Sequence, residues 1–121
     1  MALERAVETV RKLIPDLDER ISRFEVESVT VDNELLSIFC EELERMSRDI
    51  QVGLDNGNYE LIRKTVHSIK GMGGAMGLPE ISVLAQEIED ALRSGQEDRF
   101  VELCTALIEW ANGVVADNQS A

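Results

Sequence analysis

Hydrophobic residues recur along this chain at alternating steps of three and four residues, which is the spacing of one buried face on an α-helix. The longest such stripe predicts a helix that begins after Asp32, a suitable N-cap, and continues to about Leu54. Its apolar positions are Leu36, Phe39, Leu43, Met46, Ile50 and Leu54. The turn sequence at residues 55–58 ends this helix, and Asn58 can cap the next one.

Three more stripes follow, with short breaks between them. Gly77-Leu78-Pro79 separates the second helix from the third, and Gly95 closes the third helix at Ser94. The apolar positions are Ile62, Val66, Ile69, Gly73 and Met76; then Ile81, Leu84, Ile88 and Ala91; and, between about Glu97 and Val115, Phe100, Leu103, Cys104, Leu107, Ala111 and Val114. Four major helices with short connections predict an all-α fold, an antiparallel four-helix bundle.

An extra helical segment precedes this bundle. Residues 3–13 form a short amphipathic pattern that ends at Pro15 and Asp16, and a second short helical turn is expected from Leu17 to Phe24. Residues 25–30 are rich in β-branched side chains without a helical period, so we expect a connector there. The predicted organisation is a helical extension over 1–28, the bundle over 29–116 and a polar tail over 117–121.

Composition narrows the class of protein. A chain of 121 residues suits one domain, and a net charge of −12 argues against a nucleic-acid partner, which would need a basic surface. Neither a signal peptide nor an apolar run of about 18 residues is present, so we expect a cytoplasmic protein with no membrane partner. Cys40 and Cys104 sit far apart in apolar patterns and are predicted to be buried free thiols. One histidine and two distant cysteines predict no metal site.

That histidine, His67, falls on the outer side of the second major helix. At about 100° per residue it lies about 140° from the centre of the apolar stripe, so it is predicted to face water. Residues 61–79 contain no acidic side chain, whereas Arg63, Lys64 and Lys70 carry three positive charges. The sign of the charge around His67 is therefore opposite to that of the rest of the chain.

Glycines cluster beside the histidine. Gly71, Gly73, Gly74 and Gly77 are half of the eight glycines in the chain, and each costs a helix about 1 kcal/mol relative to alanine. Gly73 falls on the apolar stripe, where close helix packing explains it. Gly71 and Gly74 face outward with His67, where a missing side chain lets another surface approach the imidazole.

The glycines do not form a nucleotide-binding loop. The run at 71–77 lacks the last glycine of G-x-G-x-x-G and follows a helical pattern rather than a strand. The chain also lacks G-x-x-x-x-G-K-[ST], so no ATP site is evident.

Residues 67–77, HSIKGMGGAMG, closely resemble the signature of histidine-containing phosphotransfer (HPt) domains: histidine, any residue, an aliphatic residue, lysine, glycine, small residues, then an apolar residue and glycine. The resemblance covers about residues 32–112. It continues through Leu78-Pro79-Glu80, Leu84-Ala85, Glu89, Ala91 and Gly95.

The resemblance implies a phosphocarrier rather than an enzyme. Such a domain takes a phosphoryl group from the aspartyl phosphate of one response-regulator receiver domain, for example that of a hybrid sensor histidine kinase, and passes it to another. It binds no ATP and needs no cofactor, because the receiver supplies the aspartate and Mg²⁺. We expect a monomer.

The resemblance also implies residue roles. His67 would be the phosphorylated nucleophile and Lys70 the cation that steadies the phosphoryl oxygens. Glu89 stands where relatives often carry a Glu or Gln that orients the histidine, although its helical position alone equally allows a solvated carboxylate. The expected docking residues are Arg63 and Lys64, which would steer an acidic partner, together with Ser68, Gly71 and Gly74.

Two other classes of function stay open. The chain could be a non-phosphorylated interaction module that docks a receiver or a histidine kinase. An enzyme that uses His67 as a general base has the least support, because no second histidine, paired carboxylates or cofactor motif accompanies it.

Overall fold

The computed structural model describes residues 2–22, 33–75 and 79–119, and in this part of the chain it contains six helices and no strand. The helices are α1 (Ala2–Leu13), α2 (Leu17–Ile21), α3 (Asn33–Asn56), α4 (Tyr59–Ala75), α5 (Pro79–Arg93) and α6 (Glu97–Gln119). The prediction of an all-α fold is confirmed.

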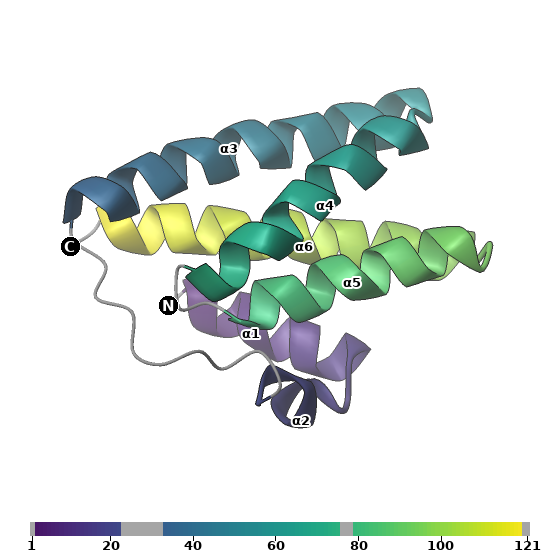
Figure 1. Ribbon diagram of the computed structural model, residues 1–121, viewed down its shortest axis with the longest axis horizontal. Coiled ribbons are helices and arrows are strands. Elements are labelled where there is room, and N and C mark those ends of the chain that lie inside the picture. Colours follow the sequence, from purple (N-terminus) through teal and green to yellow (C-terminus); the bar gives the residue numbers. More distant parts are fainter. Residues whose placement is uncertain (1, 23–32, 76–78, 120–121) are drawn as a thin grey trace.

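Helices α3 to α6 form the predicted bundle. Each contacts the next along the chain, and α3 also contacts α6, which closes the ring of four. Figure 1 shows that consecutive helices of this set run in opposite directions, with α4 crossing in front of α6 and alongside α5. Helix α1 packs against α6, and the short α2 packs against α5. The N-terminal helices therefore lie on the α5–α6 side of the bundle.

The turns between the long helices have the predicted chemistry. Gly57 and Gly95 adopt positive φ angles of 67° and 73°, which other residues rarely adopt, just after the ends of α3 and α5. Behind Gly95, the Gln96 N–H donates to the carbonyl of Ala91 at 2.9 Å, the bond of a Schellman motif. Asn58 caps α4, as predicted, by accepting a 3.3 Å hydrogen bond from the Leu61 N–H.

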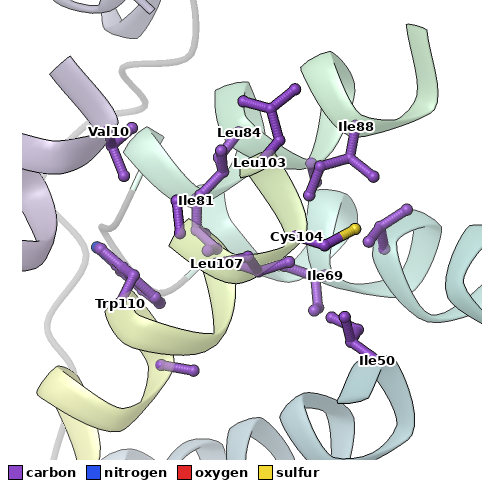
Figure 2. Packing of buried hydrophobic residues seen from close by; sticks show 14 of the residues in the cluster. Val10, Ile50, Ile69, Ile81, Leu84, Ile88, Leu103, Cys104, Leu107 and Trp110 are labelled. Carbon is purple, nitrogen blue, oxygen red and sulfur yellow. The ribbon is translucent and has the colours of Figure 1, made fainter. Parts of the chain in front are cut away.

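One apolar cluster fills the molecule, and the N-terminal helices contribute to it. Figure 2 shows side chains from α1, α3, α4, α5 and α6 meeting in this core. Trp110 is fully buried, and Val10, Ile14 and Leu17 of the N-terminal segment are each only 1% exposed. Cys40 and Cys104 are buried free thiols, as predicted, and burial raises the pKa of Cys104 to about 12. The N-terminal helices α1 and α2 are thus part of the same core as the four-helix bundle.

Replacing Ile14 by alanine tests this contribution. We expect Ile14→Ala to lower the free energy of unfolding by about 2–5 kcal/mol, because it leaves a cavity in a packed interior. The exposed Lys12 nearby provides a control, since Lys12→Ala should change stability by less than about 0.5 kcal/mol. Chemical denaturation monitored by Trp110 fluorescence measures both. Equal stability of the two variants would show that the N-terminal segment does not hold the fold.

A partly buried ionic cluster also fastens the N-terminal segment. The carboxylate of Glu87 on α5 binds Arg20 of α2 and, at 2.9 Å, Arg99 of α6. Burial by itself raises the pKa of Glu87, but the hydrogen bonds from Arg99 and Arg20 outweigh that effect and hold the pKa below its ordinary value. Glu87 therefore joins three helices through one side chain.

The lowered pKa of Glu87 predicts an acid-dependent stability. A carboxylate whose pKa is depressed on folding stabilises the protein above its ordinary pKa, and this contribution is lost as pH falls through the depressed value. We expect Glu87→Gln to lower the free energy of unfolding by about 1.5–3 kcal/mol at pH 7. The difference from wild type should shrink as the pH is lowered below about 4. Urea denaturation at a series of pH values measures it, and a difference that does not vary with pH would contradict this account.

Several predicted boundaries need correction or lie outside the described residues. Helix α2 ends at Ile21 rather than Phe24, and α6 continues past Val115 to Gln119, so residues 117–119 of the expected polar tail are helical. No proline or turn sequence stops α6, and a polar end leaves no hydrophobic period to detect. The expected connector at 25–30, Asp32, Met76 and the Gly77-Leu78 part of the predicted break lie outside the described residues, as do the side-chain surroundings of Leu3 and Gly73.

Candidate functional site

Helix α4 presents His67 to solvent because its opposite face is buried. Ile62, Val66 and Ile69 are at most 2% exposed, whereas the His67 side chain is 71% exposed. This orientation agrees with the helical spacing. The imidazole is accessible to a partner molecule from outside the bundle.

Glu89 of α5 reaches both His67 and Lys70. Its Oε1 lies 3.6 Å from His67 Nδ1, and its Oε2 accepts a 3.5 Å hydrogen bond from Lys70 Nζ. The Glu89 side chain is 15% exposed, so it is not a solvated carboxylate, one of the two alternatives that helical position allowed. A 2.9 Å hydrogen bond from Ser82 Oγ to the carbonyl of Lys70 further joins α5 to α4 beside these groups.

The Glu89 Oε1 atom lacks a hydrogen-bond donor among the described residues. It is buried, and no hydrogen bond reaches it within the part of the chain that the structure describes. A buried carboxylate oxygen without a donor is unfavourable. This oxygen lies 3.6 Å from His67 Nδ1, just beyond hydrogen-bond distance, so a proton on Nδ1 would direct a donor toward it.

Open space adjoins the imidazole. Gly71 is exposed, and a Cβ atom built there would meet nothing within 4 Å. A shallow hollow beside it is lined by His67, Lys70, Gly71 and Gln86. Gly74 lies within helical α4, but its surroundings are outside the described side chains. The clearance that the sequence suggested is thus visible at Gly71.

Two of the three cations near His67, Arg63 and Lys70, are paired with carboxylates, so this surface carries less net positive charge than the sequence suggested. Arg63 donates two hydrogen bonds, of 3.0 and 2.5 Å, to Glu60, and these lower the pKa of Glu60. Lys70 is likewise paired with Glu89. Glu60 comes one residue before the stretch that lacks acidic side chains, and Glu89 reaches the site from α5, so neither carboxylate belongs to residues 61–79. The i, i+3 spacing of Glu60 and Arg63 was the signal for the first pair.

The remaining predicted docking residues lie on the same helix. Lys64 and Ser68 are both exposed, and Ser68 Oγ donates a 3.3 Å hydrogen bond to the Lys64 carbonyl. Arg63 borders a second hollow, which it shares with Glu89, Leu92 and Arg93 of α5. Sequence reasoning missed Gln86 and Arg93, because only the packing of α5 against α4 brings Gln86 beside His67 and Arg93 beside Arg63.

No metal or membrane site accompanies these residues in the described ranges. No three His, Cys, Asp or Glu side chains of those ranges come together as a metal site would require. Nor is any of the six described helices both long and apolar enough to cross a bilayer.

Of three comparisons with known proteins, one finds a match. The family model described as the Hpt domain matches residues 34–117, a range that begins in α3 and ends in α6 and leaves α1 and α2 outside. No curated protein and no solved structure matches the chain.

Proposed function

Because this chain belongs to the Hpt domain family, the histidine phosphotransfer modules of two-component signalling, we propose that it carries a phosphoryl group on His67 between receiver domains. The group comes from the aspartyl phosphate of one receiver, such as that of a hybrid sensor kinase, and goes to a second receiver. The observation that supports this most is an exposed imidazole whose Nδ1 faces a buried carboxylate oxygen and whose flank at Gly71 is open.

The transfer is a displacement at phosphorus. The lone pair of His67 Nε2 forms the N–P bond while the O–P bond of the aspartyl phosphate breaks and the aspartate leaves as a carboxylate. A neutral imidazole is a competent nitrogen nucleophile. The Nδ1 proton stays on the ring, which becomes cationic, and Glu89 stabilises that charge. Transfer to the second receiver reverses these steps.

Lys70 supplies positive charge close to the reaction. Its ammonium lies 3.5 Å from Glu89 Oε2 and its side chain is one-third exposed, so Lys70 is held near His67 and stays accessible. A phosphoryl group on Nε2 offers Lys70 a stronger anionic partner than the shared carboxylate. The chain needs no cofactor of its own in this scheme, since Mg²⁺ belongs to the receiver. The open flank at Gly71 leaves room for the receiver, we expect the same of Gly74 one helical turn from it, and Arg63, Lys64 and Ser68 border the docking surface.

The test is a transfer assay with a panel of receiver domains from the same organism, each phosphorylated by a small-molecule donor. We expect at least one receiver to label the chain with acid-labile, alkali-stable phosphate, the stability of a phosphohistidine. Peptide mapping should place the label on the segment that contains His67. Failure of every receiver to label the chain, or an acid-stable label, would overturn the proposal.

A further inference from the structure

Gln86 occupies a position beside the phosphorylation site that the proposed mechanism does not use. It lies on α5 one helical turn before Glu89, and these two residues share the face that packs toward α4. Gln86 lines the hollow that also contains His67 and Gly71. A molecule that reaches the imidazole over the open flank at Gly71 therefore meets the side chain of Gln86.

The chemistry of this position differs from that of its neighbours. Helix α5 carries acidic residues at Glu80, Glu87, Glu89 and Asp90, in a chain with 24 acidic residues. Glu87 faces away, toward Arg20 and Arg99, and Glu89 is balanced by Lys70. A carboxylate at position 86 would have no such balance and would repel a phosphoryl group in the hollow. The amide of Gln86 is neutral, and it both donates and accepts hydrogen bonds.

We propose that Gln86 is a docking residue for the receiver domain, with its side-chain amide hydrogen-bonding the receiver where that domain approaches His67 over Gly71. This inference rests on the proposed function and extends it. Gln86 sets the affinity for the partner, whereas Glu89 and Lys70 act on the imidazole and the phosphoryl group.

Two substitutions separate affinity from reactivity. Gln86→Glu keeps the size of the side chain and adds one negative charge, and we expect it to raise the Kd for the receiver by about tenfold. Gln86→Ala removes only a neutral hydrogen bond and should raise Kd by about fivefold. Phosphoramidate, a small donor that needs no docking surface, should phosphorylate Gln86→Ala, which adds no charge, at the wild-type rate. The receiver used is the one that labels the wild-type chain fastest.

Asn112→Asp provides the matched control. Asn112 is exposed on α6, outside the hollow, and this substitution is also an isosteric amide-to-carboxylate change of one charge. It should leave Kd unchanged, and thermal melts should show all variants folded. A wild-type Kd for Gln86→Glu, or slower labelling of Gln86→Ala by phosphoramidate, would overturn the docking role. Absence of receiver-dependent labelling in the wild type would instead overturn the proposed function.

Discussion

Replacement of His67 by glutamine is expected to abolish phosphoryl uptake and to leave the fold intact. The amide of glutamine is not a nucleophile, and no second histidine exists in the chain to replace it. Because His67 is 71% exposed and on the outer face of α4, the change in stability should be below about 0.5 kcal/mol. Labelling from a phosphorylated receiver and a urea melt measure the two effects.

Thr105→Ala is the control for His67→Gln. Thr105 is also exposed, lies on α6 outside the hollow, and its hydroxyl donates to the Val101 carbonyl one turn earlier, so this substitution should leave labelling at the wild-type rate. Binding of the unphosphorylated receiver should persist in His67→Gln. Labelling of this variant equal to wild type would refute the carrier role of His67. Unchanged signalling output in cells that carry His67→Gln would instead identify a docking module that works without phosphate.

Replacement of Gly71 by leucine is the second change with a large expected effect. Nothing lies within 4 Å of a Cβ atom at Gly71, so the bundle has room for the new side chain. The same side chain would occupy the hollow beside His67 through which the receiver approaches. In-line transfer is sensitive to displacement of about 1 Å, so we expect the transfer rate to fall about 100-fold. Phosphoramidate labelling, which needs less space, should fall far less.

A pair of alanine substitutions separates clearance from stability. Gly71→Ala removes a helical glycine from an open position and should raise the free energy of unfolding by about 0.5–1 kcal/mol. The same change at the buried Gly53 places a Cβ atom 2.5 Å from Ile62 Cγ1 and 3.0 Å from the Asn58 carbonyl oxygen. Gly53→Ala should therefore destabilise the protein by about 1–3 kcal/mol. Destabilisation by Gly71→Ala would contradict the open site at Gly71, and stabilisation by Gly53→Ala would contradict the close packing at Gly53.

The helical pattern and the position of His67 were predictable from the chain alone. Alternating steps of three and four residues locate a buried stripe on each long helix, and the opposite face follows from the helical period. His67, Gly71 and Lys70 lie within one turn of each other, so their proximity is a local property of α4. The HSIKG signature is local for the same reason, and it led to the family that matches residues 34–117.

Contacts between helices depend on tertiary packing, which the hydrophobic period of a single helix does not predict. The stripe on α5 predicted Ile81 and Leu84 as buried, yet Val83 is also fully buried, since α4, α6 and α2 all pack against this helix. The packing of α5 against α4 also brings the carboxylate of Glu89 and the amide of Gln86 to the site on α4. Sequence thus determined which face of α4 carries the imidazole, because that depends on backbone geometry within one helix. Only the tertiary structure decided what stands beside it, because those groups come from residues about 20 positions away whose relative placement is set by side-chain packing in the shared core.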